Sequence, residues 1–136
     1  MSKIAVVYWS RTGNTQQMAQ TVADACGGEL LTCGEFDAAK ADAFDAVALG
    51  CPAMGAEELE ESEMRPMFDA VKASLSGKKV ALFGSYDWGD GEWMRTWYDR
   101  CSNAGAEMIQ SEGLIANLEP DDDAIAACKE LGAKLQ

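Results

Sequence analysis

The sequence predicts a doubly wound α/β fold, in which helices cover both faces of a five-stranded parallel sheet. The first observation is that five apolar, strand-sized segments alternate with segments whose apolar residues recur at helical spacing. Such an alternation is typical of βαβ units joined by right-handed crossovers. The second is that loops of unusual composition follow the first, third and fourth strands. Ligands of doubly wound sheets bind outside the carboxyl ends of the strands, where these three loops converge.

The first unit is a buried strand, a tight loop and a helix. An apolar run over residues 4–9 ends in Ser10-Arg11-Thr12-Gly13-Asn14-Thr15, and Met18, Val22 and Cys26 then fall on one helical face. A helix start offers unpaired N–H groups and a positive dipole end, the hydroxyls add donors, and glycine permits close approach. The loop suits either a phosphate or an ordinary Ser/Thr-capped helix. It is not a Walker loop, because the Gly-Lys-Ser/Thr ending is missing.

The middle of the chain continues the alternation. Gly27-Gly28 ends the first helix, residues 29–33 predict the second strand, and the polar stretch 34–43 predicts a loop with a short helix. Residues 45–50 are apolar on both faces, as a buried parallel strand is. The loop that follows is Cys51-Pro52-Ala53-Met54-Gly55-Ala56-Glu57-Glu58. The next helix is expected to point these side chains inward: Met64, Met67, Phe68, Val71 and Leu75.

The last third of the chain predicts two more strands and two more helices. Residues 80–84 form the fourth strand, and the aromatic, glycine-rich loop Ser85-Tyr86-Asp87-Trp88-Gly89-Asp90-Gly91 follows it. The next helix carries Trp93, Met94, Trp97 and Cys101 on one face. Met108-Ile109 and Leu114-Ile115 predict two pieces of a fifth strand, and Pro120 opens the last helix. Because no repeat or linker occurs, we expect residues 1–136 to form a single domain.

The composition excludes several classes of function. Eleven basic against twenty-three acidic residues give a net charge of −12. Such a surface repels nucleic acid and anionic membranes and steers basic protein partners toward it, although acidity also simply keeps proteins soluble. The absence of histidine removes Ser-His-Asp and Cys-His sites and most transition-metal sites. Without a signal-like segment or a membrane-length apolar run, the expected location is the cytoplasm.

The cysteines predict buried, reduced thiols. Their number is odd, and no two of them have the Cys-x-x-Cys spacing of a redox or zinc motif. Most of them fall within apolar patterns, where a thiol packs as a small hydrophobic group. The five are Cys26, Cys33, Cys51, Cys101 and Cys128.

The three loops together suggest a flat ligand with a phosphate tail. Met54 and Trp88 are placed to clamp a planar ring from opposite faces, and Glu57 to accept a hydrogen bond from a ring N–H. Taken one at a time, Met54 and Trp88 fit core packing equally well, and Glu57 fits a solvated acid at a helix start. Their position in loops that meet at one sheet edge favours the site.

These loops resemble the cofactor loops of the flavodoxin family. Ser10–Thr15 matches its phosphate loop, Ser/Thr-x-Thr-Gly-Asn-Thr, while Gly50–Gly55 and Leu82–Gly91 look like the flavin-clamping loops of its short-chain subgroup. The similarity runs along nearly the whole chain, with no room for the insertion of long-chain members. It implies the flavodoxin-like strand order 2-1-3-4-5, non-covalently bound FMN, and one-electron transfer between partner proteins.

The resemblance also implies roles for single residues. Ser10, Thr12, Asn14 and Thr15 would hold the phosphate together with the loop amides. Met54 would cover the inner face of the isoalloxazine and Trp88 the outer face, with Glu57 at N3–H and the backbone of Asp87 and Gly89 at the pyrimidine edge. The Gly55–Ala56 peptide would turn over on reduction and present its carbonyl to N5–H. The other expected cofactor-binding residues of these loops are Arg11, Gly13, Pro52, Ala53, Ser85 and Tyr86.

The chain departs from the common subgroup pattern at four positions. Arg11 stands where glycine is frequent, Pro52 lacks a hydroxyl that some relatives have, Ala56 replaces an acidic or polar residue, and Asp87 replaces a frequent glycine. The last two bear on the redox potentials rather than on the function.

Acidic residues are expected to set both the potential and the partners. Carboxylates near fully reduced, anionic FMN lower the potential of the second electron, which predicts a low-potential carrier shuttling between semiquinone and hydroquinone. The acids of the loops are Glu57, Glu58, Glu60, Glu61, Glu63, Asp87 and Asp90. We expect Glu60 and Glu61 to guide docking while barely affecting the potential. The expected partners have basic docking surfaces, as reductases and ferredoxin-linked oxidoreductases do, and the expected state is monomeric.

Two alternatives share this fold. One is an FMN-dependent NAD(P)H:quinone-type reductase, against which stand the lack of a long substrate loop and of a basic cluster for a nicotinamide phosphate. The other is a cofactor-free domain of the response-regulator kind, which holds magnesium with acids at its strand ends. Here the first strand ends in Trp9-Ser10-Arg11-Thr12, which offers no carboxylate.

Overall fold

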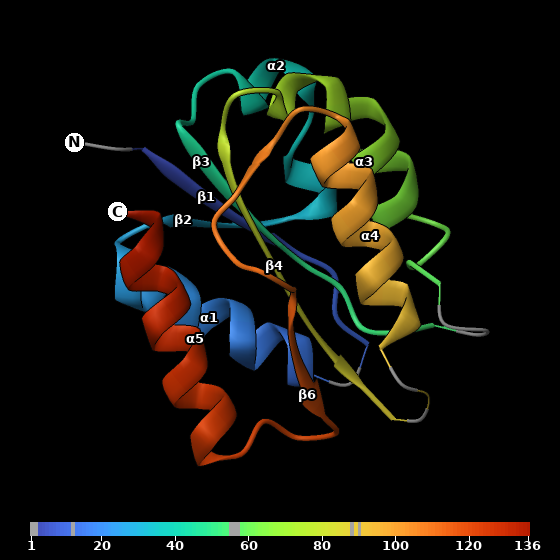
Figure 1. Cartoon of the computed structure of the whole chain (residues 1–136), viewed down its shortest axis with the longest axis vertical. Coiled ribbons are helices and arrows are strands. Elements are labelled where there is room, and N and C mark those ends of the chain that lie inside the picture. The colour runs from blue at the N-terminus through green and yellow to red at the C-terminus, as the bar shows by residue number, and fades with distance from the viewer. Residues whose placement is uncertain (1–2, 12, 55–57, 88, 90) are drawn as a thin grey trace.

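The protein has a parallel β-sheet with helices on both of its faces (Figure 1). The computed structural model describes residues 3–11, 13–54, 58–87, 89 and 91–136. The strand order is β2-β1-β3-β4-β5, and β6 also pairs with β4. The strands are β1 (Ile4–Tyr8), β2 (Glu29–Thr32), β3 (Ala46–Gly50), β4 (Lys79–Tyr86), β5 (Glu107–Met108) and β6 (Leu114–Asn117). The expected fold class and strand order are thus confirmed.

The helices lie close to where the apolar spacing predicts them. They are α1 (Asn14–Cys26), α2 (Ala38–Ala41), α3 (Met64–Val71), α4 (Glu92–Asn103) and α5 (Asp122–Leu135), with single 3₁₀ turns over Cys33–Glu35 and Lys72–Leu75. The expected helix over residues 64–75 therefore tightens after Val71. The last helix begins two residues after Pro120, because the Asp121 carboxylate caps it by accepting a 2.8 Å hydrogen bond from the Ala124 amide.

The predicted fifth strand is indeed in two pieces. β5 pairs with the start of β4 and β6 pairs with its end, both in parallel. Between the pieces, the Gln110 side chain stands in for the backbone: its Oε1 accepts from the Leu82 amide at 2.9 Å, and its Nε2 donates to the Leu82 carbonyl at 3.3 Å. The side chain thereby satisfies the buried peptide group that the break would leave unpaired.

The core has two layers, one on each face of the sheet. α1 and α5 pack together over one face, and α3 and α4 cover the other (Figure 1). All five cysteines are free and buried, which confirms the expected burial of the thiols. Burial raises the pKa of Cys101 to about 12 and that of Cys128 to about 11, so both thiols stay protonated at neutral pH.

Gly84 allows the chain leaving β3 to lie directly against β4. A Cβ atom built at Gly84 would stand 2.1 Å from the carbonyl oxygen of Cys51 and 3.2 Å from the Trp93 ring. The Cys51 carbonyl is held there because it accepts a 3.1 Å hydrogen bond from the Trp93 indole. Because the backbones of Gly84 and Cys51 are both fixed, no side chain at position 84 fits between them.

We expect Gly84→Ala to destabilise the protein by about 1–3 kcal/mol, the usual cost of forcing extra volume into a packed core. Urea-induced unfolding followed by circular dichroism measures this. Gly34→Ala is the matched control, because a Cβ at Gly34 meets nothing within 4 Å. It should leave stability unchanged or raise it by up to about 1 kcal/mol. Equal effects of the two substitutions would contradict the close-contact explanation.

Candidate functional site

Three loops meet at one edge of the sheet. β1, β3 and β4 are neighbours, and their parallel register places Tyr8 beside Gly50 and Gly50 beside Phe83. The segments that leave these strands are the β1 loop (residues 10–15), the β3 loop (residues 51–63) and the β4 loop (residues 87–91). Their convergence at the carboxyl ends of the strands is where a doubly wound sheet binds its ligand.

The β1 loop turns into α1 through Gly13. Gly13 is the N-cap of α1 and has a φ of 96°, a conformation that strongly favours glycine. The Ser10 hydroxyl accepts hydrogen bonds from the amides of Gly13 (3.1 Å) and Gln16 (3.2 Å). Among the described residues, the amides of Asn14 and Thr15 find no acceptor. The first turn of α1 therefore keeps free donors for an anion.

Thr15 links the β1 loop to β4. Its hydroxyl and that of Ser85 lie 2.9 Å apart, and the Ser85 amide donates to Thr15 Oγ1 at 3.4 Å. Both residues are almost fully buried, with exposed fractions of 1% and 5%. Thr15 thus fixes the start of α1 against the neighbouring strand in addition to offering a hydroxyl. Arg11, by contrast, is exposed.

The β3 loop is fastened along its length. The Cys51 amide donates to the Phe83 carbonyl at 3.2 Å, and the Ala53 amide to the Ser85 carbonyl at 3.0 Å. Met54 and Glu58 then exchange two backbone hydrogen bonds of 3.0 and 2.9 Å, which close a short antiparallel bridge. The three residues between them, 55–57, lie outside the described part of the chain.

Glu60 is a buried carboxylate within the β3 loop. It is 5% exposed and accepts hydrogen bonds from the amides of Ser62 (2.7 Å), Glu63 (2.8 Å) and Met64 (3.0 Å), and from the Ser62 hydroxyl. Burial raises the pKa of its carboxyl, but the hydrogen bonds outweigh this and hold the pKa below its ordinary value. An ionised Glu60 therefore joins the loop to the start of α3.

The expectation that Glu60 and Glu61 both serve docking is wrong for Glu60. A carboxylate enclosed by its own loop cannot meet a partner, whereas Glu61 is exposed. Sequence alone cannot distinguish the two residues, because a run of acids before a helix is usually solvated. Only the fold of the loop separates them.

A hydrogen bond that the sequence does not reveal joins β1 to α3. The indole Nε1 of Trp9, the residue after β1, donates to the carboxylate of Glu63 at 2.6 Å. Cys33 lies near this cluster, and burial together with the charges of Glu63 and Glu60 raises the pKa of its thiol to about 12. Because Trp9 and Glu63 are 54 positions apart, no local pattern could identify the pair.

The β4 loop is held from the side of β6. The side-chain amide of Asn117 donates to the carbonyls of Tyr86 (3.1 Å) and Asp87 (3.4 Å), and the Leu118 amide donates to the Tyr86 carbonyl at 2.8 Å. At the far end of the loop, Gly91 caps α4 with a φ of 91°. Like Trp9, Asn117 helps to hold the loops at this sheet edge, and no sequence pattern identifies it.

The predicted cofactor residues fall into two groups. The structure brings these to the shared sheet edge: Ser10, Arg11, Gly13, Asn14, Thr15, Pro52, Ala53, Met54, Ser85, Tyr86, Asp87 and Gly89. Outside the described residues lie Thr12, Gly55, Ala56, Glu57 and Trp88, as does Asp90. Of the two residues predicted to clamp the ring, the structure therefore describes Met54 and not Trp88.

The chemistry of the edge fits a phosphorylated, flat cofactor. Hydroxyls and free amides gather at the start of α1, and half-buried apolar residues follow at Ala53 and Met54. In the residues that the structure describes, no group of three or more His, Cys, Asp or Glu side chains is placed to hold a metal ion. Within the same residues, no helix combines the length and apolar character that a membrane span requires.

Comparisons with known proteins point to one family. A family model described as flavodoxin matches residues 6–131. The flavodoxin of Megasphaera elsdenii is 44% identical over 134 residues, covering 95% of each chain, and that of Clostridium beijerinckii is 42% identical over 135 residues, covering 96% of each. The solution structure of two-electron reduced M. elsdenii flavodoxin has a TM-score of 0.85 at 40% identity over 97% of both chains.

We expect Glu60→Gln to lower the free energy of unfolding by about 1–3 kcal/mol at pH 7, because it leaves buried donors without their charged acceptor. The pKa of Glu60 is lower in the folded protein than in the unfolded chain. Its contribution is therefore complete above the ordinary glutamate pKa and is lost as the pH falls through the lowered value. The difference from wild type should shrink on acidification.

The measurement is urea-induced unfolding of both proteins at neutral and acidic pH. Glu61→Gln removes the same charge one position away from an exposed side chain, and it should change stability by no more than about 0.5 kcal/mol. A destabilisation by Glu60→Gln that persists unchanged at low pH would contradict a role for the ionised form.

Proposed function

This chain belongs to the flavodoxin family of FMN-binding electron carriers, and we propose that it passes single electrons at low potential between proteins with basic docking surfaces. As a flavodoxin it is an electron-transfer protein and not an enzyme, and a reductase function is not favoured. The observation that carries the proposal is the meeting of the three loops at one sheet edge, beside a helix start with free amides.

The proposed phosphate site is the β1 loop. Ser10, Asn14 and the amides of the first turn of α1 are available, and Arg11 is the one cation of the loop. Neutral donors at a helix start bind a phosphate through many short contacts and through the helix dipole. Thr12 and Thr15 complete the proposed set; the buried Thr15 hydroxyl would be shared between the phosphate and Ser85.

The proposed ring site lies between the β3 and β4 loops. Pro52, Ala53 and Met54 form the described part of its inner side, and Ser85, Tyr86, Asp87 and Gly89 belong to the outer side. By family resemblance, Trp88 would stack on the outer face, Glu57 would accept a hydrogen bond from the ring, and the Gly55–Ala56 peptide would change its orientation with the redox state. When bound, FMN supplies a ring that takes up and releases electrons one at a time.

Charges of this chain would set the potential. A carboxylate near the cofactor opposes the addition of negative charge and lowers the reduction potential. Glu60 is the strongest candidate, because a buried ion is screened by salt much less than exposed ions are. Asp87 and Glu58 are exposed, so each is expected to have a smaller, salt-dependent effect.

The proposed docking surface surrounds the same edge. Glu58, Glu61 and Asp87 are exposed there, within a chain of net charge −12. Opposite charges speed encounter and orient partners, more than they add affinity. We propose reductases and ferredoxin-linked oxidoreductases as the partner class, a monomeric state, a cytoplasmic location, and one FMN-binding domain over residues 1–136.

The first test separates phosphate binding from ring binding. Ser10→Ala should weaken FMN binding roughly tenfold, the value of about one charge-assisted hydrogen bond. Riboflavin, which lacks the phosphate, should bind to both proteins equally. Thr21→Ala is the control, because the Thr21 hydroxyl donates to the Gln17 carbonyl on the outer side of α1. Titrations of the three proteins with each flavin, followed by flavin fluorescence, give the six constants, and equal losses for both flavins would place the phosphate elsewhere.

The second test concerns docking. Glu61→Gln should slow electron transfer from the reduced protein to cytochrome c, a basic one-electron acceptor, at low ionic strength. The difference should fade as salt screens the surface. Glu130→Gln, on α5 at the other face of the sheet, removes the same charge and should have a smaller effect. Stopped-flow rates that are the same for wild type and Glu61→Gln at low salt would rule out this docking role.

A further inference from the structure

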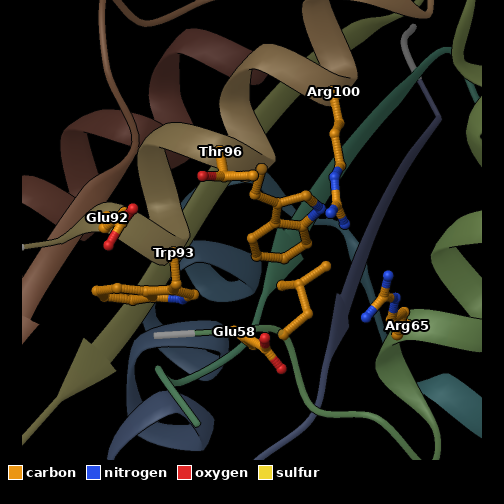
Figure 2. Close-up of a pocket in the computed structure, with 8 residues that line it drawn as sticks. Glu58, Arg65, Glu92, Trp93, Thr96 and Arg100 are labelled. Atoms are coloured by element: carbon orange, nitrogen blue, oxygen red, sulfur yellow. The ribbon is translucent and has the colours of Figure 1, made fainter. Parts of the chain in front are cut away.

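A pocket of about 260 Å³ lies between α3 and α4, beside the β3 loop (Figure 2). It is separate from the proposed cofactor residues, although Glu58 at the end of the Met54–Glu58 bridge forms part of its rim. Its walls combine the aromatic rings of Trp93 and Trp97 with the side chain of Leu59, all of them buried. The rings and the leucine offer a ligand an apolar surface, while the charged side chains of the pocket are exposed to water.

Two arginines reach this pocket from different helices. Figure 2 shows Arg65 on α3 and Arg100 on α4 with their guanidinium groups directed toward one another at one side of the pocket. Neither group forms an ion pair or a hydrogen bond with any described residue, although Glu58 also lines the pocket. The carboxylates of Glu58 and Glu92 also line the pocket, so a bound anion must gain more from the two guanidinium groups than it loses to these acids.

A buried donor lies in the wall of the same pocket. Trp97 is fully buried, and its indole Nε1 is the one buried side-chain nitrogen or oxygen without a partner among the described residues. The Phe68 ring packs perpendicular to it, with 6.0 Å between centroids, and offers at most a weak π acceptor. An unsatisfied buried N–H is costly, and because this one is closed off from solvent, an acceptor oxygen in the pocket reaches it only when neighbouring side chains shift.

We propose that this pocket is an anion site that binds a carboxylate carried on a small apolar body. The two guanidinium groups match the planar, bidentate geometry of a carboxylate. The tryptophan and leucine walls suit the apolar part of the ligand. The carboxylate belongs either to a small molecule or to an acidic side chain of a docked protein, and the two sources are distinguished below.

The test titrates the FMN-loaded protein with benzoate and, as a neutral molecule of the same shape, with benzamide. Low ionic strength is needed because the arginines are exposed. The NMR signal of the Trp97 indole N–H reports occupancy, and the flavin absorbance spectrum reports that the cofactor site is unchanged. Benzoate should shift the indole signal in a saturable way and bind at least about tenfold more tightly than benzamide.

Variants identify the groups responsible. Arg65→Gln and Arg100→Gln should each weaken benzoate binding about tenfold and leave benzamide unaffected. Lys129→Gln, on α5 at the other face of the sheet, removes one positive charge elsewhere and should change neither constant. Equal binding of benzoate and benzamide, no binding of benzoate, or benzoate binding that survives both arginine substitutions would each overturn the proposal.

A blocked tripeptide, acetyl-Ala-Glu-Ala-amide, then distinguishes the two sources, with its glutamine counterpart as the control. If the glutamate peptide competes with benzoate and the glutamine peptide does not, the site accepts a protein side chain. If benzoate alone binds, the site serves a small molecule. Either result supports a carboxylate site, and neither depends on electron transfer.

Discussion

Ser85, near the end of β4, holds both the β1 loop and the β3 loop against that strand. Its hydroxyl meets Thr15 of the β1 loop at 2.9 Å, and its carbonyl accepts from Ala53 of the β3 loop at 3.0 Å. The neighbouring Gly84 leaves room for the Cys51 carbonyl, which any larger residue would displace. The end of β4 therefore fixes the spacing between the proposed phosphate site and the proposed ring site.

The acidic residues near the site are of two kinds, exposed and buried. Glu58, Glu61 and Asp87 lie in water, where salt and solvent weaken their fields and where a partner can reach them. Glu60 is enclosed by amides that keep it ionised, so salt screens its charge less than it screens the exposed acids, and its carboxylate also holds the β3 loop to α3. The exposed acids are thus suited to guiding partners, whereas the buried Glu60 is suited to holding the loop and biasing the potential.

The sequence predicted what depends on local pattern. Strands, helices and the order of loops follow from apolar spacing, and the divided fifth strand was visible because Met108-Ile109 and Leu114-Ile115 are separate apolar pairs. It could not predict the links between distant segments: Trp9 with Glu63, Asn117 with Tyr86, or the Gln110 side chain that replaces a backbone pair. Glu60 was misjudged for the same reason, since its burial results from how the loop folds back.

The described bonds confine any redox-linked change of the β3 loop to a small region. Met54 and Glu58 are joined by two backbone hydrogen bonds, Ala53 is tied to β4, and Glu60 is tied to the start of α3. If these bonds hold, the turn of the Gly55–Ala56 peptide that we propose from the family resemblance would leave Ala53, Met54 and Glu58 in place. Less of the backbone would then reorganise when an electron is gained or lost.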